Sequence, residues 1–247
     1  MSYHYNGLSS VPYEGIAYGN DTFVAISRLG NISASSTDNG KTWIEYDMPI
    51  GDWYGIAYGE GTFVAVSKSY DTSAISTDNG KTWTEYDMPA GNWRGIAYGD
   101  GTFVAVSYWC NIIATSTDNG KTWTQHSVPN CNWYGIAYGD GAFVAVSHGK
   151  SSTSIDNGTT WTQHSMPAGY WYGIAYGDGV FVAVDYLDCI CAKSTDNGKT
   201  WEQFIMPSGL WYNITYGDGA FVALNYPFNK IVISADNGET WKGQKAY

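Results

Sequence analysis

Side chains that could carry out catalysis are few and widely separated in this chain of 247 residues. Hydrolysis of glycosides requires two carboxylates about 5–10 Å apart that face one pocket. Asp71 and Asp188 stand in comparable variable segments, but in the second and fifth copies of a repeat that is described below. The histidines are not grouped either: they are His4, His126, His148 and His164. No phosphate-binding loop, metal-ligand spacing or nucleophile elbow occurs. The sequence therefore predicts a protein that is not an enzyme and that holds neither metal nor cofactor.

Aromatic side chains suggest binding chemistry instead, because exposed aromatic rings contribute strongly to binding energy. Several occur in segments that differ in every copy of the repeat, where drift alone should leave Ser, Asn and Lys. We interpret these as ligand-binding residues: Tyr70, Tyr108, Trp109, Tyr186 and Phe228. The alternative is that these segments vary only because surface loops are free to do so.

A second aromatic set recurs at a fixed place in the chain: Trp53, Trp93, Trp133, Trp171 and Trp211, with Tyr13 in the first copy. An indole face stacks well on a sugar ring, and five equivalent sites would favour multivalent capture of a glycan. The alternative is that these indoles are structural residues that are buried between neighbouring repeats. Both interpretations remain open from the sequence.

The elements that position these residues are organised by the segment Ser36–Trp43, which reads STDNGKTW. Asn-Gly tolerates positive φ at both centres of a type I′ turn, and a preceding Asp accepts hydrogen bonds from the N–H groups of the turn. The segment recurs at Ser76–Trp83, Ser116–Trp123, Ser154–Trp161, Ser194–Trp201 and Ser234–Trp241. Its aspartates, spaced 40, 40, 38, 40 and 40 residues apart, are Asp38, Asp78, Asp118, Asp156, Asp196 and Asp236. We expect these six aspartates to be structural.

The pattern Ser-x-Asp-x-Gly-x-Thr-Trp resembles the Asp-box of bacterial-neuraminidase-type (BNR) repeats. In that family the box joins the third and fourth strands of a β-propeller blade. The resemblance implies a fold and little about function, since unrelated activities occur on such propellers. Sialidases of this type use three arginines, whereas this chain has only Arg28 and Arg94. The resemblance therefore does not extend to sialidase activity.

Each repeat contains four runs of β-branched and aromatic residues separated by turn signals, and none has helical periodicity. We therefore predict an all-β, six-bladed β-propeller with four antiparallel strands per blade and an Asp-box in each third-to-fourth strand turn. One domain should span residues 1–247, and residues 1–12 should form a closing segment along the last blade. The repeats cover residues 13–52, 53–92, 93–132, 133–170, 171–210 and 211–247.

The net charge of −11 argues against nucleic acid or anionic membrane as a partner, since both would be repelled. No apolar run is long enough to span a bilayer, and the first residues do not read as a signal peptide. The sequence is thus that of a soluble chain with no stated compartment, and we expect a monomer. The cysteines lack zinc spacing and should be free thiols, with a Cys110–Cys131 bridge as the alternative.

One face of the blades should be uniform and the other diversified. The link between the second and third strands differs in every copy and should emerge on the face opposite the Asp-boxes. We therefore expect a non-catalytic binding module whose ligand, a glycan or a protein, meets that variable face. A lectin should use the repeated tryptophans, whereas a protein-docking or assembly scaffold should use the unrepeated aromatics. A third possibility is an engineered or recently amplified repeat scaffold without a natural ligand.

Overall fold

The computed structural model describes residues 8, 11–225 and 230–244. The proposed closing segment 1–12 lies outside the described residues except for residues 8, 11 and 12, and Phe228 lies outside them as well. All regular elements in the described part of the chain are β-strands. The chain divides into two compact units, residues 1–127 and 128–247, and each is described by itself. A single domain over residues 1–247 stays a prediction.

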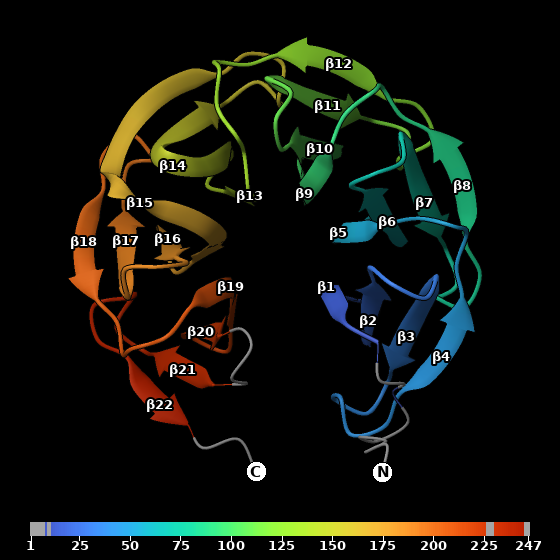
Figure 1. Ribbon diagram of the computed structural model, residues 1–247, viewed down its shortest axis with the longest axis horizontal. Helices are drawn as coiled ribbons and strands as arrows, with labels where there is room; N and C mark the ends of the chain where they lie inside the picture. The colour runs from blue at the N-terminus through green and yellow to red at the C-terminus, as the bar shows by residue number, and fades with distance from the viewer. Residues whose placement is uncertain (1–7, 9–10, 226–229, 245–247) are drawn as a thin grey trace. The chain divides into compact units, whose positions relative to one another are not determined.

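The first unit contains three four-stranded antiparallel sheets in simple up-and-down order, one for each of the first three repeats. The first strands of these sheets, β1, β5 and β9, lie beside one another (Figure 1). The strands of this unit are β1 (Tyr13–Gly19), β2 (Thr22–Ser27), β3 (Ile32–Ser36), β4 (Ile44–Asp47), β5 (Trp53–Gly59), β6 (Thr62–Ser67), β7 (Thr72–Ser76), β8 (Thr84–Asp87), β9 (Trp93–Gly99), β10 (Thr102–Ser107), β11 (Ile112–Ser116) and β12 (Thr124–Ser127).

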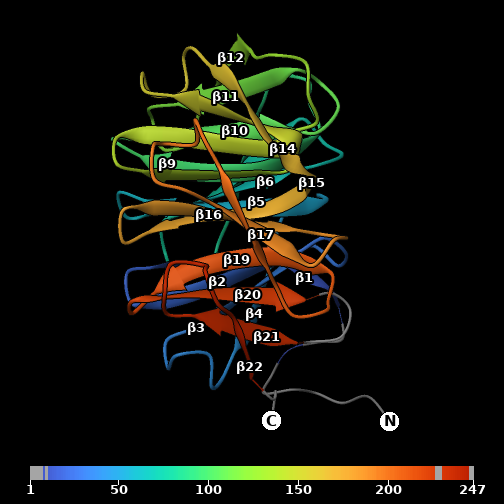
Figure 2. The ribbon, with the colours of Figure 1, turned by 90° about the vertical axis from the view of Figure 1, so that its left-hand side faces the viewer.

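The second unit contains one six-stranded sheet, in the order β13 to β18, and one four-stranded sheet, β19 to β22. Figure 2 shows the strands of this unit from the side, where β15, β16 and β19 are neighbours. The strands are β13 (Gly135–Gly139), β14 (Ala142–Ser154), β15 (Thr162–Gly177), β16 (Val180–Asp185), β17 (Ile190–Ser194), β18 (Glu202–Ile205), β19 (Trp211–Gly217), β20 (Ala220–Asn225), β21 (Ile231–Ser234) and β22 (Lys242–Gln244).

The expectation of six four-stranded blades is wrong, because the six repeats form five sheets. Two long strands join the fourth and fifth repeats. β14 continues through the link of the fourth repeat, 148–151, which has four residues where the other links have six. β15 continues from the end of the fourth repeat into the first strand of the fifth. His148 pairs with Tyr170 across these strands, so the short link hydrogen-bonds to the connector and no break separates the two repeats.

The core of each unit lies between successive sheets. The Asp-box tryptophans Trp83, Trp123 and Trp201 pack against these cores from the turns, and Trp241 belongs to one of them. In the first unit, Trp53 and Phe63 of the second sheet pack against Val24 and Ile26 of the first. Because a twisted sheet packs face to face on its neighbour, the apolar side chains of both faces of each middle sheet are covered.

Serine hydroxyls join successive repeats of one unit to each other. Ser33 Oγ in β3 donates to the carbonyl oxygen of Gly80, in the Asp-box of the next repeat, at 2.8 Å. It also accepts from Trp83 Nε1 at 3.0 Å. Ser73 and Ser151 make the same two bonds with the boxes that follow them. Each bond joins two successive repeats of one unit and satisfies a fully buried hydroxyl, as a buried polar group requires.

The same position carries different residues elsewhere. Cys191 Sγ replaces the serine in the fifth repeat and contacts the Gly238 carbonyl oxygen and Trp241 Nε1 at 3.1 and 3.2 Å. Ile113 and Ile231 stand there in the last repeat of each unit and have no donor to offer. The residue at this position therefore allows a hydrogen bond between successive repeats of one unit.

Candidate functional site

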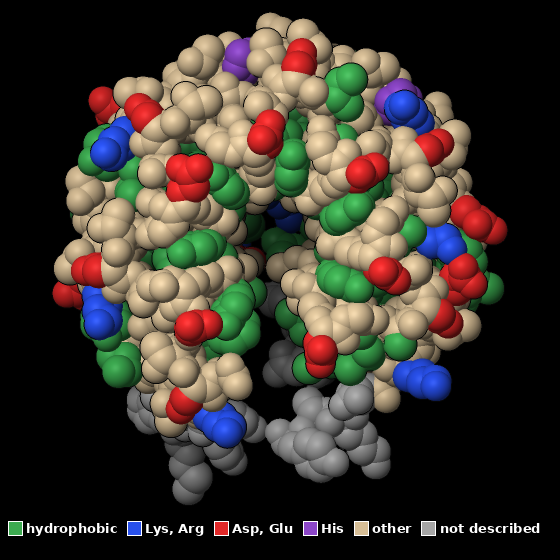
Figure 3. Space-filling view, turned by 180° about the vertical axis from the view of Figure 1, so that it is seen from behind, with side chains coloured by type: hydrophobic (Ala, Val, Ile, Leu, Met, Phe, Trp, Pro, Cys, Tyr) green, Lys and Arg blue, Asp and Glu red, His purple; other side chains and the backbone are tan. Residues whose placement is uncertain are grey.

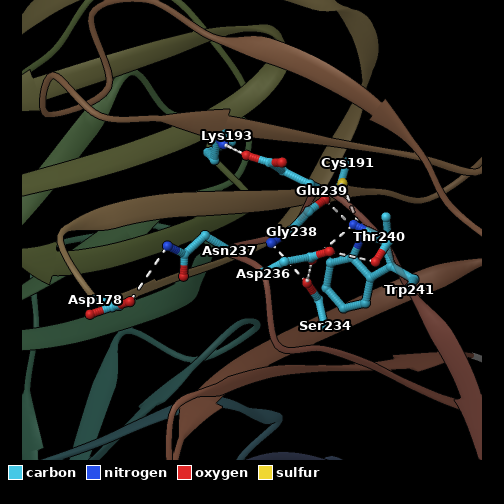
Figure 4. A network of polar contacts seen from close by, with 10 residues as sticks. All are labelled: Asp178, Cys191, Lys193, Ser234, Asp236, Asn237, Gly238, Glu239, Thr240 and Trp241. Atoms are coloured by element: carbon cyan, nitrogen blue, oxygen red, sulfur yellow. Dashed lines mark hydrogen bonds and ion pairs between the residues drawn. The ribbon is translucent and has the colours of Figure 1, made fainter.

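The Asp-boxes are structural turns, and the box of the sixth repeat illustrates their geometry (Figure 4). Asp236 Oδ1 accepts hydrogen bonds from Ser234 Oγ at 2.7 Å and from the Thr240 backbone N–H at 2.9 Å. The second carboxylate oxygen accepts from the Thr240 hydroxyl. Asn237 and Gly238 have φ of 58° and 87°, so the expected positive φ at both turn centres is confirmed. All six boxes repeat the hydrogen bond from the serine hydroxyl to the carboxylate, as expected for a structural turn.

The same hydrogen bonds control the charge of the box aspartates. The Thr42 hydroxyl and then the Thr42 N–H lower the pKa of Asp38 to about 2. Burial alone would raise the pKa of Asp236, but the bonds from Thr240 and Ser234 outweigh it and lower that pKa to about 2. The pKa is lowered by the same balance in the other four boxes, at Asp78, Asp118, Asp156 and Asp196. Every box carboxylate is therefore charged at neutral pH.

The repeated tryptophans are core residues. Each has an exposed fraction of 0%: they are Trp53, Trp93, Trp133, Trp171 and Trp211. In four of them the indole N–H donates to a proline carbonyl oxygen four residues earlier, at 3.0 Å, as Trp53 does to Pro49. An indole face in this position is covered by neighbouring strands and cannot stack on a sugar. Of the two interpretations drawn from the sequence, the structure agrees with burial between blades.

The variable links lie at the end of each sheet opposite the Asp-boxes and are tied to the connectors between repeats. The backbone N–H of Met48 donates to the Asn31 carbonyl oxygen at 2.7 Å, and that of Gly51 donates to Asn31 Oδ1 at 3.1 Å. Asp71 ties the second link to its connector in the same way. The diversified side chains are therefore presented by an ordered, hydrogen-bonded surface.

Three cations meet at Tyr54 in the first unit. Lys68 Nζ lies 4.8 Å from the centroid of the Tyr54 ring, and the guanidinium carbons of Arg94 and Arg28 lie 5.7 and 5.9 Å from it. Arg28 also donates a hydrogen bond from Nη1 to the Tyr54 hydroxyl at 3.1 Å. We call Arg28, Lys68 and Arg94 around Tyr54 the cationic cluster. Each of these side chains is half-buried, so the charges are partly removed from water yet remain reachable.

The local charge balance of the cationic cluster is positive. Arg28 Nε lies 3.7 Å from Glu14 Oε1, and the hydrogen bond to Tyr54 raises the pKa of Arg28. Arg94 faces a second ring, with its guanidinium carbon 5.7 Å from the centroid of Tyr108. Cations over aromatic faces are stabilised by the ring quadrupole, which offsets part of their mutual repulsion. The arrangement can attract an anionic group.

An exposed aromatic pair continues this surface. The rings of Tyr108 and Trp109 have centroids 5.4 Å apart, and Trp109 is 70% exposed. Trp109 also has a φ of 85°, which is a rare and strained conformation for a bulky side chain. Tyr70, in the neighbouring link, is 48% exposed. The cationic cluster is thus bordered by rings that water contacts in the free protein.

The second unit carries tyrosines where the first carries cations. The Tyr172 ring stacks on Tyr134 at 4.4 Å and on Tyr186 at 4.8 Å, with interplanar angles of 17° and 19°. Tyr212 lies 5.6 Å from Tyr172 in a tilted contact. We call these four residues the tyrosine cluster. Tyr186, one of the residues expected from the sequence, is therefore part of an aromatic group rather than an isolated contact.

Sequence reasoning missed most of both clusters: it named Tyr186 of the tyrosine cluster and no member of the cationic cluster. Every cluster residue stands at one of two places: directly after the repeated tryptophan, or at the start of the link. The first place holds Glu14, Tyr54, Arg94, Tyr134, Tyr172 and Tyr212, and the second holds Arg28, Lys68, Tyr108, His148, Tyr186 and Tyr226. The first place varies inside a strand whose neighbours hardly change, and this variation was the signal that could have identified it.

The described part of the chain contains no metal site, no disulfide and no membrane-spanning helix. No group of three His, Cys, Asp or Glu side chains is placed to hold a metal ion among residues 8, 11–225 and 230–244. The four cysteines are free thiols, which excludes the Cys110–Cys131 bridge in this structure. Over the same residues, no helix is long and apolar enough to cross a membrane.

On the face seen in Figure 3, acidic side chains are scattered over the surface, while most Lys and Arg side chains lie toward its edge.

Comparison with protein families identifies the repeat. The BNR/Asp-box repeat family model matches residues 74–85, 114–125 and 192–203, which contain the boxes of Asp78, Asp118 and Asp196. The chain therefore contains BNR/Asp-box repeats, as the sequence pattern predicts. No curated protein matches the sequence.

Comparison with solved structures gives propellers of low sequence identity. YCF48 bound to D1 peptide is 16% identical, with a TM-score of 0.72 over 98% of this chain and 82% of that chain. The Neurospora crassa Pan2 WD40 domain is 9% identical, with a TM-score of 0.74 over 95% of this chain and 79% of that one. A nidogen/laminin complex contains a chain that is 12% identical, with a TM-score of 0.71 over 87% of this chain and 90% of its own. At these identities the likeness shows the fold alone.

Proposed function

We propose that this chain, a β-propeller with BNR/Asp-box repeats, is a non-catalytic module that binds a peptide segment of a partner protein. The binding surface is formed by the links and by the residues that follow the repeated tryptophans. The observation that carries the proposal is Trp109, a 70% exposed indole held at a φ of 85° beside Tyr108. A strained, exposed aromatic residue is costly in the free protein, and such strain clusters at ligand-binding sites.

The chemistry of the surface favours a protein over equivalent glycan sites. The five indoles that would give a lectin repeated sugar platforms are buried, so sugar stacking at those positions has no support. The exposed rings Tyr70 and Trp109 occur once each, and unrepeated aromatic anchors suit a single peptide. Two of the similar solved structures, YCF48 with D1 peptide and the nidogen/laminin complex, contain protein or peptide partners of their own. We expect the module to act as a monomer.

Selection from a phage-displayed library of random dodecapeptides, on the immobilised full chain, tests this function. Selected peptides are then labelled with fluorescein and titrated by anisotropy. Trp109→Ala should weaken binding by roughly thirtyfold, since hot-spot aromatics contribute about 2 kcal/mol or more. The matched control is Ile205→Ala in β18, which removes an apolar side chain that is 82% exposed on another element. Peptides that bind both variants equally, or a failure to select any peptide, would count against the proposal.

A glycan array run with the same two variants addresses the alternative ligand class. Neutral sugars bound in a way that depends on Trp109, without any selected peptide, would assign the exposed rings to glycan recognition. If the protein binds no glycan on the array and selects no peptide, the result would agree with a repeat scaffold that has no natural ligand. Size-exclusion chromatography with light scattering measures the oligomeric state, and a mass other than one chain of 27.1 kDa would contradict the monomer.

A further inference from the structure

We propose that the cationic cluster is an acidic-residue subsite, in which Arg28, Lys68 and Arg94 bind an Asp or Glu side chain of the docked peptide. This inference rests on the proposed function and names the chemistry of one part of its partner. The aromatic pair Tyr108 and Trp109 would then hold an apolar or aromatic peptide residue beside the acidic one.

The first support is the uneven use of cations along the chain. The protein has 12 Lys and Arg residues against 23 Asp and Glu residues, and it contains only two arginines. Both arginines, together with Lys68, converge on the ring of Tyr54. Bringing like charges together opposes folding, because they repel one another across a partly desolvated space. The protein as a whole has a net charge of −11, so this local concentration of cations is not a general property of its surface.

The second support is that Glu14 and Asp52, the two acids whose charges act on Arg28, are fewer than the three cations of the cluster. Within the described residues, Lys68 has no salt bridge, and its ammonium group lies over the Tyr54 ring. Arg28 approaches Glu14 at 3.7 Å, which is longer than a charge-assisted hydrogen bond. Its buried Nε atom has no hydrogen-bond partner among the described residues. The ammonium group of Lys68 is thus a donor that a carboxylate oxygen would satisfy.

The third support concerns the type of anion. A guanidinium group presents a planar fork that matches a carboxylate, and two arginines with one lysine suit a compact acidic group. Long polyanions such as nucleic acid would meet the negative charge of the rest of the protein and be repelled. With Glu14 and Asp52 counted against the three cations, one positive charge remains, which one peptide carboxylate can neutralise. An acidic peptide fits this balance.

The fourth support is the environment of the charges. The cluster side chains are half-buried, and the rings of Tyr54 and Tyr108 form apolar walls beside Arg94. Apolar walls lower the local dielectric, so a pair formed there is stronger than a pair on an open surface. The tyrosine cluster of the second unit repeats the same places in the chain without the cations. Selectivity for acidic residues should therefore come from the cationic cluster.

The test compares each selected peptide with a copy in which Asp and Glu are replaced by Asn and Gln. On the full-length protein, the acidic peptide should bind about tenfold more tightly than its amide copy, because hydrogen bonds to charged groups contribute about 1.5–3 kcal/mol. Lys68→Gln and Arg94→Gln should each reduce that ratio, and added salt should reduce it further. The matched control, Lys121→Gln, removes one exposed Asp-box lysine and should leave the ratio unchanged.

The outcomes separate this inference from the proposed function. Peptides that bind at Trp109 but show no preference for acidic over amide copies would overturn the inference and leave the function intact. Equal effects of Lys68→Gln and Lys121→Gln would overturn it as well. If a cluster variant fails to fold in circular dichroism, the acid-to-amide ratio on the unmodified protein decides. A protein that selects no peptide contradicts both proposals.

Discussion

Ser151 and Ser152 are neighbours in β14, and both have an exposed fraction of 0%. Ser151 Oγ donates to the Gly198 carbonyl oxygen at 2.7 Å and accepts from Trp201 Nε1 at 3.0 Å. Ser152 Oγ is buried without a hydrogen-bond partner among the described residues. Replacing each serine by alanine removes the same atom from two adjacent buried positions. The two substitutions should change the free energy of unfolding in opposite directions.

The magnitude follows from the partners that remain after each change. In Ser151→Ala, Trp201 Nε1 keeps its bond to the Gly198 carbonyl oxygen at 2.9 Å, so neither partner is left without a hydrogen bond. The loss is then the net value of two hydrogen bonds, about 1–3 kcal/mol. In Ser152→Ala, an unsatisfied hydroxyl leaves the core, which should stabilise the protein by up to about 1 kcal/mol. Four of the other five repeats carry alanine at the position of Ser152, so the new side chain fits there.

Urea unfolding followed by tryptophan fluorescence, together with thermal melts, measures both effects. Ser151→Ala should lower Tm by about 2–12 °C, because a loss of about 1–3 kcal/mol shifts Tm by about 2–4 °C per kcal/mol in chains of this size. Ser152→Ala should leave Tm unchanged or raise it. Equal losses for the two variants would show that the hydrogen bonds of Ser151 to the next repeat are not what distinguishes them, and would refute the stabilising role assigned to Ser151.

Two further predictions concern the turns and the strand contacts. Because the box carboxylates have lowered pKa values, their contribution to stability is complete above pH about 4 and is lost as the pH falls toward the folded value, about 2 for Asp236. Asp236→Asn should make the acid transition shallower between those values in near-UV circular dichroism, and an unchanged profile would contradict this. A Cβ atom at Gly59 would lie 2.2 Å from the Tyr98 ring, so Gly59→Ala should cost about 1–3 kcal/mol. The equivalent change at Gly217, where a Cβ atom meets nothing within 4 Å, should cost less than about 0.5 kcal/mol, and equal urea midpoints would argue against the contact.

Local features were predictable because they depend on neighbouring residues. The Asp-box turns, the four strands of each repeat and the position of the links follow from Asn-Gly signals and from strand-length apolar runs. The number of sheets was not predictable in the same way. It depends on whether the short link 148–151 bends away or stays extended, and that is decided by its hydrogen bonds to the connector in another part of the chain.

The clusters were largely missed for a related reason, since only Tyr186 was expected as a binding residue. Lys68 opens a variable link, whereas Tyr54 and Arg94 stand inside strands that otherwise hardly change. Their proximity arises because β5 and β9 are neighbours and because the links follow β6 and β10. The depth of the repeated indoles was likewise a property of packing between sheets, since the same tryptophan pattern suits either a core or a sugar platform.

The positions that open the links show how one scaffold can carry different chemistry. The backbone N–H of Lys68 donates to the Asp52 carbonyl oxygen at 2.8 Å, and those of Tyr108 and Tyr186 donate to the equivalent carbonyl oxygens at 2.8 and 2.9 Å. The main chain is thus held in the same way whether the side chain is a cation or a tyrosine. Because the fold does not depend on the identity of this side chain, substitutions there change recognition at little cost in stability. Under the proposed function, the cationic and the tyrosine cluster would therefore differ in the peptide side chains that they accept, although the main chain is held in the same way at both.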